Sequence, residues 1–168
     1  MPQPTHNEII EFLEQSNAIE GVTDGISLRD AMAAWEYLMT QDTLSTQTVR
    51  KVHKILMERQ DLDNRYKGRY RICPVYIGNH EAMNFRLIQE TLKEWCKMMN
   101  QPASHSAIDN ELEAKFRHVQ YEKCHPFIDG NGRTGRMFMN WQRLRKLGLP
   151  LLTIHTGVEQ YKYYEWFR

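Results

Sequence analysis

Apolar residues recur along most of this chain at the three- and four-residue spacing that places them on one face of an α-helix. The first such segment covers residues 5–20, where one face carries Ile9, Leu13, Ser16 and Glu20. Thr5 or Asn7 is the expected N-cap, and Gly21 follows where a glycine commonly ends a helix. Because Glu20 shares its face with apolar residues, we expect its carboxylate to point toward the protein interior.

Capping signals predict further helices in the N-terminal half. Ser27-Leu28-Arg29-Asp30 has the spacing of a capping box and opens a helix to about Thr40. The apolar positions of this helix are Ala34, Trp35, Leu38 and Met39. Ser45 is the expected N-cap of the next helix. The buried edge of that helix is predicted to be Val49, Val52 and Leu56.

After Glu58 the pattern changes to one that is typical of a β-hairpin. The segment from Gly68 to Asn79 is rich in β-branched and aromatic residues between glycines, and it predicts the only hairpin of the chain. Pro74 cannot donate a hydrogen bond to a paired strand, so we expect it at the turn or on an exposed edge.

The C-terminal half returns to helical spacing. The helix after the hairpin is predicted from a stripe of Phe85, Ile88, Leu92, Trp95 and Met99. A capping box at Ser106 to Asp109 opens the next helix, whose apolar positions are Ile108, Leu112, Phe116 and Val119. A further helix ends at Gly148-Leu149-Pro150 and carries Met137, Trp141 and Leu144. Val158 to Arg168 begin an aromatic-rich helix that ends abruptly, so either the chain is truncated or the packing partner of these aromatic residues is missing.

Length and composition narrow the class of protein. Six or seven helices and one short hairpin in 168 residues predict a compact all-α fold with a single globular domain. A net charge of +1 gives no electrostatic reason to expect nucleic acid or a membrane as partner. The N-terminus lacks the apolar core of a signal peptide, and no later run is long enough to span a membrane, so we expect a cytoplasmic protein.

The spacing of the cysteines and histidines argues against a fold held together by disulfides or by a structural metal ion. Cys73, Cys96 and Cys124 are scattered and form no C-x-x-C pair, which favours neither a disulfide framework nor a zinc site. The histidines outside the motif described next show no ligand spacing on a common helix face. His53 lies beside the apolar edge of its helix and is interpreted as a histidine at the margin of the core.

Groups that carry chemistry are concentrated between His125 and Arg136. Gly130-Asn131-Gly132 leaves backbone N–H groups uncovered where a helix begins, and such a helix N-terminus favours bound anions. Arg133 and Arg136 are three residues apart, so we expect them to project together as a pair that grips successive phosphates. His125 can accept a proton near neutral pH, and Mg²⁺ prefers a carboxylate such as Asp129 beside phosphates. The stretch therefore predicts a phosphate site with a base beside it.

Residues 125–136 read His-Pro-Phe-Ile-Asp-Gly-Asn-Gly-Arg-Thr-Gly-Arg. This string resembles the signature of the Fic (filamentation induced by cAMP) family, His-x-Phe-x-(Asp/Glu)-Gly-Asn-Gly-Arg-x-x-Arg, and matches every specified position. The order of predicted elements is also similar to the Fic core, a compact helical domain whose hairpin is called the flap. The resemblance implies a protein adenylyltransferase, which transfers AMP from ATP to a Ser, Thr or Tyr hydroxyl of a target protein and releases pyrophosphate.

The resemblance also implies a role for each residue of the motif. His125 would be the general base that takes the hydroxyl proton, and Asp129 would hold a Mg²⁺ ion that bridges the α- and β-phosphates. The amides of Gly130 to Gly132, with Asn131, would stabilise charge on the transferring and leaving oxygens. Arg133 would meet the β-phosphate and Arg136 the γ-phosphate.

Other residues are expected to support the motif or to dock the target. Phe127 is an inward aromatic residue that would anchor the loop. Val75 and Ile77 on the flap are candidates to bind a target segment by strand addition, although plain packing within the hairpin explains them equally well. The flap leads into His80-Glu81-Ala82-Met83-Asn84, where many family members carry prolines, so its reach stays open.

An upstream segment resembles a regulatory motif. Ser16-Asn17-Ala18-Ile19-Glu20-Gly21 is similar to the (Ser/Thr)-x-x-x-Glu-(Gly/Asn) inhibitory motif of self-restrained Fic proteins. A carboxylate on an inward face is costly unless it meets a cation, and Arg136 is the expected partner of Glu20. The alternative is a surface pair with any Lys or Arg. On the first interpretation residues 1–22 form an inhibitory helix segment and residues 23–168 form the Fic core.

Several alternative functions stay open from the sequence. The same site could remove AMP from a modified protein, with Glu20 positioning water, or could transfer another nucleotide or phosphate-containing group. A kinase-type relative is disfavoured by the second glycine and the paired arginines. A non-enzymatic module that only binds nucleotide would be favoured only if His125 or Asp129 were absent. Association into a homo-oligomer is compatible with the sequence.

Overall fold

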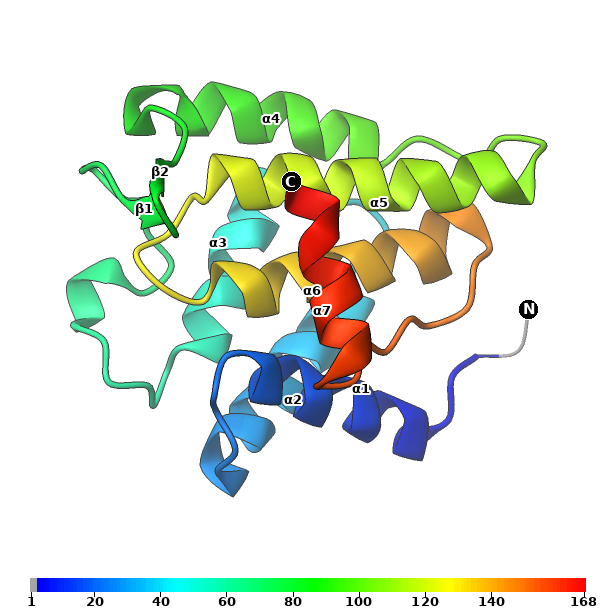
Figure 1. Ribbon diagram of the computed structural model, residues 1–168, viewed down its shortest axis with the longest axis horizontal. Coiled ribbons are helices and arrows are strands. Elements are labelled where there is room, and N and C mark those ends of the chain that lie inside the picture. Colours follow the sequence, from blue (N-terminus) through cyan, green and yellow to red (C-terminus); the bar gives the residue numbers. More distant parts are fainter. Residues whose placement is uncertain (1–2) are drawn as a thin grey trace.

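The structure is a computed structural model that describes residues 3–168 and is mostly helical (Figure 1). Its helices are α1 (His6–Ile19), α2 (Gly25–Met39), α3 (Thr46–Leu56), α4 (Ile88–Met99), α5 (Ala107–Cys124), α6 (Asn131–Gln142) and α7 (Val158–Tyr164). A short antiparallel hairpin pairs β1 (Tyr76–Ile77) with β2 (His80–Glu81). Short 3-10 turns lie at Asn64–Tyr66, Phe85–Leu87 and Glu165–Phe167, and a π-helical turn, Arg143–Leu147, prolongs α6. The predicted all-α fold with one small hairpin is confirmed.

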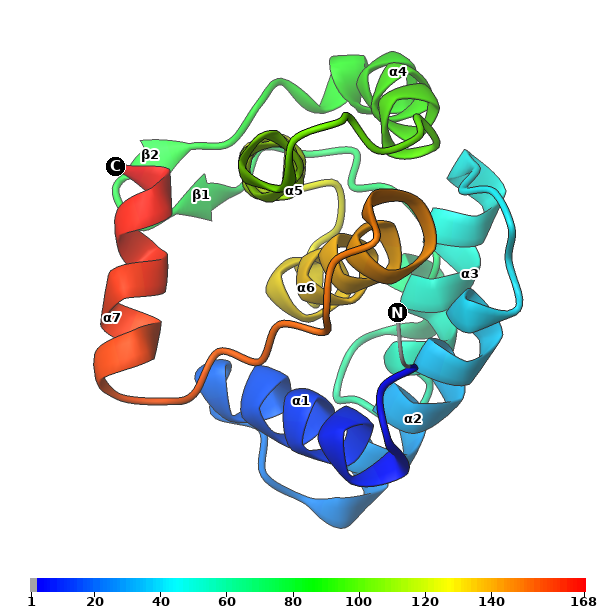
Figure 2. The same ribbon diagram turned by 90° about the vertical axis from the view of Figure 1, so that its right-hand side faces the viewer.

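Helix α6 runs through the middle of the protein, and the other helices surround it (Figure 2). Its side chains are buried from Arg133 to Gln142, apolar and polar alike. Phe138 and Trp141 are fully buried in the main hydrophobic core, which also contains Phe12 of α1, Trp35 of α2 and Trp95 of α4. Because α6 begins directly after the glycine-rich loop, the most enclosed helix of the fold holds the phosphate motif in place.

Helix α1 forms as the sequence predicts. Thr5 is the N-cap and makes a full capping box with Glu8, which lowers the pKa of that carboxyl through hydrogen bonds from the Thr5 backbone and side chain. Phe12 and Leu13 are buried, and Glu20 is the C-cap. Gly21 adopts a φ of 72°, the left-handed conformation that a glycine supplies after a helix.

The start of α2 differs from the prediction. The N-cap is Asp24 and not Ser27, because the Asp24 carboxylate accepts hydrogen bonds from both the backbone N–H and the hydroxyl of Ser27. A carboxylate that bonds two donors outcompetes the single hydroxyl cap expected at Ser27. Ser45 and Ser106 do cap α3 and α5, as predicted.

The hairpin is shorter and lies later in the chain than predicted. Residues 68–75 form no strand, since the Arg71 backbone N–H donates to the carbonyl of Pro126 at 2.9 Å and the Arg71 side chain is buried. The Gly78-Asn79 pair makes the turn, and the backbone N–H of Ala82 donates to the Val75 carbonyl beyond the strand pair. Pro74 is exposed and precedes β1, which agrees with the prediction that it stands outside a paired strand.

The buried face of α5 was wrongly predicted. Ile108, Leu112 and Phe116 are 72%, 60% and 53% exposed, so the apolar stripe faces solvent. The inward face carries Asn110, Ala114, Arg117, His118, Tyr121 and Cys124. Polar side chains of this face find buried partners, since His118 Nε2 is hydrogen-bonded to the Tyr163 hydroxyl at 2.7 Å and the Tyr121 hydroxyl to the Thr134 hydroxyl at 2.8 Å. The prediction from helical periodicity takes the apolar face of a helix as its buried face. In α5 the buried face instead carries polar residues that lie next to the motif.

The C-terminal aromatic residues have a packing partner within the chain. The rings of Tyr163, Trp166 and Phe167 lie 5.6, 6.3 and 5.8 Å from the ring of His118 on α5, measured between centroids. The α7 segment therefore closes over α5 and α6 (Figure 1). Of the two alternatives raised for this segment, the one in which the packing partner is missing was wrong for Tyr163, Trp166 and Phe167.

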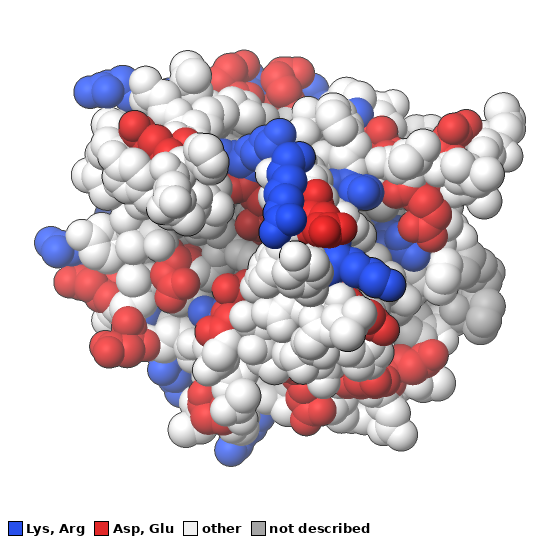
Figure 3. All heavy atoms as spheres, viewed as in Figure 1, with Lys and Arg blue, Asp and Glu red and all other residues white. Residues whose placement is uncertain are grey.

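Acidic and basic side chains are interspersed over the face shown in Figure 3. In residues 3–168, none of the helices combines the length and the apolar character needed to cross a lipid bilayer.

Candidate active site

The motif loop connects α5 to α6 through two left-handed backbone positions. His125 ends α5 with φ 48° and ψ 62°, and it is the only non-glycine residue of the described range with positive φ. Gly130 begins α6 with φ 82°. A histidine in this region is strained, and such strain persists only where the surroundings over-determine the conformation. The loop therefore presents the imidazole in a fixed position beside the helix N-terminus.

Buried hydrogen bonds and ring stacking hold the loop in that shape. The Asn131 side chain accepts from the Phe127 N–H at 2.9 Å and donates to the Phe127 carbonyl at 2.8 Å. Phe127 is fully buried and stacks on the His53 ring with centroids 3.7 Å apart, so its predicted inward position is confirmed. His53 accepts at Nδ1 from the Gly68 N–H and therefore donates from Nε2 to the Asp129 carbonyl at 2.8 Å. His53 is thus a core residue that fixes the motif loop.

Burial makes His53 a source of acid sensitivity. Desolvation lowers the pKa of His53 from 6.5 to about 4, whereas the unfolded chain binds a proton at the ordinary value. The neutral ring stabilises the fold above pH 6.5, and this contribution is lost as pH falls through about 4, roughly 3 kcal/mol in all. We expect the free energy of unfolding to fall more gently between pH 6.5 and 4 for His53→Gln than for the natural chain. Urea melts at a series of pH values measure this slope, and parallel slopes would contradict the assignment.

Arg71 joins the flap to the end of α5. Its buried guanidinium donates to the carbonyls of His125 at 2.6 Å and Cys124 at 3.1 Å. It also donates to the carbonyls of Cys73 at 2.9 Å and Met83 at 2.5 Å, which lie on the two sides of the hairpin. One side chain thus satisfies carbonyls that would otherwise be buried without partners.

The His125 imidazole is poised to accept a proton. Its Nδ1 lies 3.2 Å from the Glu122 carbonyl, which can only accept, so Nδ1 carries the proton and Nε2 carries the lone pair. Burial is the largest cause that lowers the pKa of His125 below 6.5. The ring is therefore neutral at neutral pH. It lines both cavities described below.

A small cavity of about 100 Å³ lies over the N-terminus of α6. It is lined by Glu20, His125, Ile128, Asp129, Gly130, Asn131 and Gly132. The first backbone N–H groups of a helix have no intrahelical acceptor, so this cavity is suited to an anion. The Glu20 carboxylate already lies there, because a methyl group placed on Gly132 would overlap Glu20 Oε1. A protein carboxylate thus lies where a phosphate oxygen would bind.

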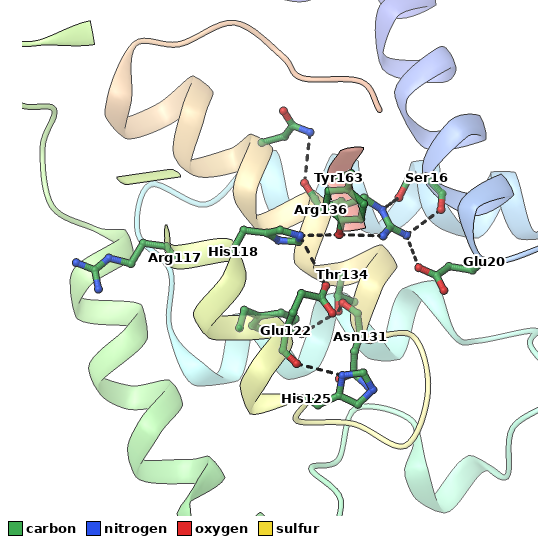
Figure 4. A network of polar contacts seen from close by, with 12 residues as sticks. Ser16, Glu20, Arg117, His118, Glu122, His125, Asn131, Thr134, Arg136 and Tyr163 are labelled. Atoms are coloured by element: carbon green, nitrogen blue, oxygen red, sulfur yellow. Dashed lines mark hydrogen bonds and ion pairs between the residues drawn. The ribbon is translucent and has the colours of Figure 1, made fainter. Parts of the chain in front are cut away.

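Arg136 is held on all sides by α1 and α7 (Figure 4). Its side chain is buried and donates to Glu20 Oε1 at 2.7 Å, to Ser16 Oγ at 2.9 Å and to the Ser16 carbonyl at 2.9 Å. Its third nitrogen donates to the Tyr163 hydroxyl at 3.3 Å. Glu20 meets Arg136 as expected, but its side chain is 40% exposed, so the expectation that it points to the interior and not to solvent is met only in part. The guanidinium has no free edge for another anion while Glu20 stays in place.

Arg133 does not pair with Arg136 as the spacing suggested. Its guanidinium points toward the end of α3, donates to Gln60 Oε1 at 3.0 Å and to Met57 Sδ at 3.4 Å, and lines neither cavity. The two arginines leave the helix toward different elements, so the expected joint fork is absent from the described geometry. Asn131 also differs from expectation, because its side-chain amide is engaged by the Phe127 backbone and only its backbone N–H is left to bind an anion.

A larger pocket of about 890 Å³ opens between the flap, α5, α6 and α7. Ile77 lines it, together with Glu122, His125, Gly132 and Arg136. Val75 does not line this pocket and precedes β1. Both strands of the hairpin are exposed, so their outer edge is available to another segment. The pocket is large enough for a nucleotide-sized ligand.

The surroundings of Asp129 are compatible with a Mg²⁺ ion that is shared between one protein carboxylate and bound phosphates. The carboxylate is 63% exposed, lines the small cavity and accepts from the Gly130 N–H at 2.7 Å, which leaves its second oxygen 4.0 Å from Arg133. Mg²⁺ typically takes one or two protein carboxylates and completes its shell with phosphates and water. No group of three or more His, Cys, Asp or Glu residues within residues 3–168 is arranged to hold a metal by itself. A Mg²⁺ site at Asp129 would depend on phosphate oxygens.

Several residues that shape the site were missed in the sequence. Tyr163 was noted only as one aromatic residue of the last helix, and Arg71 only as part of a strand. Both make their contacts with residues distant in the sequence, so spacing gave no signal for them. His53 was expected at the margin of the core and is fully buried, but its hydrogen bond to the Asp129 carbonyl of the motif loop was not foreseen.

The site combines a neutral histidine, a helix N-terminus and a buried arginine in a helical domain. This combination is typical of an enzyme site suited to an anionic ligand. A model of the Fic/DOC family matches residues 43–142, and the chain belongs to this family. The chain is 30% identical over 122 residues to protein adenylyltransferase fic-1 of Caenorhabditis elegans, which covers 71% of the chain and 23% of that protein. It is 30% identical over 104 residues to protein adenylyltransferase Fic of Drosophila ananassae, covering 60% and 20%.

Solved structures agree on the fold. The protein superposes on Fic-1 (residues 134–508) from Caenorhabditis elegans with a TM-score of 0.78 and 22% identity, over 96% of this chain and 55% of that one. A Fic family protein from Desulfovibrio desulfuricans gives a TM-score of 0.64 at 23% identity, over 79% and 46%. The aligned part is about a quarter or less of the length of the two curated relatives named above.

Proposed function

We propose that the protein is a nucleotidyltransferase that moves AMP from ATP to a Ser, Thr or Tyr hydroxyl of a target protein. The observation that carries this proposal is the neutral His125, whose free Nε2 lines the same cavity as the N-terminus of α6. A base beside a site for phosphates is what transfer to a hydroxyl needs. Homology to proteins named as protein adenylyltransferases supports the same reaction.

In this reaction His125 Nε2 takes the proton of the target hydroxyl while its oxygen attacks the α-phosphorus of ATP. The bond between the α-phosphorus and the bridging oxygen breaks, and pyrophosphate leaves with that electron pair. The N–H groups of Asn131 and Gly132 at the start of α6 stabilise the oxygens that gain charge. Arg136 holds the distal phosphate, and Arg133 contributes positive charge from behind the loop. A Mg²⁺ ion held by Asp129 would neutralise phosphate charge.

The proposal includes self-restraint through the inhibitory motif of Ser16, Glu20 and Gly21. Glu20 takes both the fork of Arg136 and the anion cavity over Gly132, so ATP binds productively only after Glu20 withdraws. Residues 1–22 then act as the inhibitory segment and residues 23–168 as the core. Ser16 anchors this segment, since both its hydroxyl and its carbonyl accept from the Arg136 guanidinium.

The flap would place the target segment. Ile77 lines the large pocket, whereas the Val75 carbonyl accepts from the Ala82 N–H within the hairpin, so Val75 would hold the base of the flap in place for the target. An extended target segment that pairs with the exposed edge would gain main-chain hydrogen bonds, and its hydroxyl would be carried toward His125.

The direct test is label transfer. Purified protein is incubated with α-labelled ATP, GTP, CTP or UTP, with Mg²⁺ and cell extract, for the natural chain and for Glu20→Gly. We expect a labelled protein band with ATP, stronger for Glu20→Gly. Labelling by another nucleotide alone would replace AMP by that nucleotide, and no labelling in any reaction would overturn the transferase proposal.

Asp129→Ala should remove the dependence on Mg²⁺ together with most of the activity. The carboxylate is exposed and has no apolar contacts to lose, so the melting temperature should change little. The rate of AMP incorporation is measured against Mg²⁺ concentration for Glu20→Gly alone and for Glu20→Gly combined with Asp129→Ala. A rate that needs no divalent ion in either variant would contradict the proposed metal role.

One observation favours a second activity at the same site. Glu20 and His125 line one small cavity, so a water molecule between them could be oriented by the carboxylate. Such a water could remove AMP from a modified target. Release of free AMP from a labelled target by the natural chain, and its loss in Glu20→Gly, would establish this reverse activity.

A further inference from the structure

Glu122 is a largely buried acid that the proposed reaction does not use. Its side chain is 14% exposed, and its Oε1 atom is buried without a hydrogen-bond partner among the described residues. The carboxylate reaches across to α6, because a methyl group on Gly135 would lie 2.5 Å from Glu122 Oε1. Glu122 also lines the large pocket together with Arg136. An unpaired acid beside the proposed phosphate-binding arginine calls for a role.

Among the groups around Glu122, Arg136 is the cation that interacts with its carboxylate. His118 Nε2 lies 3.8 Å from Glu122 Oε1 but is hydrogen-bonded to the Tyr163 hydroxyl at 2.7 Å. Burial lowers the pKa of His118 to about 3, so this ring is neutral and forms no ion pair. Figure 4 shows Glu122, His118, Tyr163 and Arg136 as neighbours in one network. Apart from Arg136 and the neutral His125, the other acidic and basic residues that line the pocket are exposed, and they are Glu20, His80, Glu81, Lys123 and Arg168.

The protonation of Glu122 responds to these neighbours. Burial raises the pKa of the Glu122 carboxyl from 4.5 to about 7, Arg136 opposes this rise, and the charge of Glu20 adds to it. Withdrawal of Glu20 removes a like charge and leaves Arg136 without its direct counter-ion. Both changes favour the ionised form of Glu122.

We propose that Glu122 is a second acidic partner of Arg136, which holds the guanidinium when Glu20 withdraws and competes with the distal phosphate of a bound nucleoside triphosphate. The inference rests on the proposed function, since it concerns how that site is regulated. A buried guanidinium without a counter-ion is costly, so a nearby carboxylate stabilises the state from which Glu20 has left. The same negative charge then opposes the phosphate until Glu122 takes up a proton.

The test is ATP affinity in variants that lack the first restraint. Calorimetry with a non-hydrolysable ATP analogue compares Glu20→Gly with Glu20→Gly/Glu122→Gln at pH 8 and pH 6. At pH 8, where Glu122 is ionised, we expect the variant with Glu122→Gln to bind about 10-fold more tightly, the size of a single lost charge contact. As the pH falls to 6 and Glu122 begins to take up a proton, the difference between the two affinities should shrink. Ionisation of the phosphates affects both variants equally.

Controls separate this effect from a general change of charge or folding. Glu36→Gln in the Glu20→Gly background removes an exposed carboxylate of α2 and should leave the affinity unchanged. AMP, which lacks the distal phosphates, should gain much less than the ATP analogue from Glu122→Gln. If Glu122→Gln lowers the melting temperature strongly, Glu122→Val replaces it, because valine removes the charge and fills apolar space.

The outcomes distinguish this inference from the proposed function. Equal affinities at pH 8, or an equal gain with AMP, would overturn the role of Glu122 while leaving label transfer intact. Tighter binding of the analogue with no label transfer in any variant would support Glu122 and overturn the transferase proposal. Failure of every variant to bind the analogue would overturn both.

Discussion

Glu20→Gly should raise the initial rate of AMP incorporation, including self-labelling, by at least about 10²-fold. The natural chain holds the Arg136 guanidinium in a 2.7 Å ion pair with Glu20, and the carboxylate also fills the cavity over Gly132. A triphosphate that is displaced from this arginine has a misaligned α-phosphate, and a misplacement of about 1 Å costs on the order of 10²-fold in rate. Removing the carboxylate restores both the fork and the cavity.

Two further variants show whether the gain comes from the ion pair. Glu14→Gly places a glycine at an exposed position inside α1, where it weakens the helix more than a glycine at the C-cap position 20 does, and should still leave the rate near that of the natural chain. Glu20→Gly/Arg136→Ala should lose most of the gain, since the freed arginine is then missing. An unchanged rate in the single variant, or a double variant as fast as the single one, would return Glu20 to an ordinary helix-end residue.

His125→Ala in the Glu20→Gly background should lower AMP transfer by about 10²–10⁴-fold and leave ATP affinity nearly unchanged. In the proposed reaction the imidazole acts on the incoming hydroxyl, whereas Arg136 and the amides of α6 hold the phosphates. Calorimetry with the ATP analogue and label transfer measure the two quantities separately. Equal loss of both would mean that His125 is structural.

The pH dependence of the same reaction checks the protonation state of His125. A base works in its neutral form, and burial lowers the pKa of His125 below 6.5. The rate with His125 present should therefore hold between pH 8 and 6.5 and decline as pH falls through the lowered pKa. His105→Ala, which removes an exposed loop histidine, should share this profile. A decline that begins well above pH 6.5 would contradict a neutral buried base.

Sequence patterns within one helical turn were sufficient to predict the structure where a single residue type decides the backbone conformation. Thr5, Ser45 and Ser106 were foreseeable caps, because each hydroxyl satisfies a backbone donor in its own turn. The pairing of Glu20 with Arg136 was also foreseeable, because Glu20 continues the face of Leu13 and Ser16, although its side chain stays 40% exposed. The start of α6 at Asn131 was predictable as well, since Gly130 takes up the left-handed conformation that other residues avoid.

Local rules failed where partners distant in the sequence decide the structure. The α5 stripe of Ile108, Leu112 and Phe116 reads as a core face, yet the opposite face is inside because its polar groups find partners on α4, α6 and α7. The direction of Arg133 depends on Gln60 and Met57, which lie 73 and 76 positions away in the sequence. Spacing along a helix fixes the angle between side chains, whereas tertiary contacts decide which of them reach the ligand.

The guanidinium of Arg71 has a consequence for how members of such a family could diversify. It fixes the carbonyls of Cys73 and Met83, the two roots of the hairpin, to those of Cys124 and His125. Residues between the two roots, including Val75 and Ile77, can therefore change in sequence or length without shifting the imidazole. We therefore expect the hairpin to be exchangeable while the motif loop and His125 keep their positions. If the flap docks the target as proposed, exchanging this hairpin between homologues should change which target is labelled.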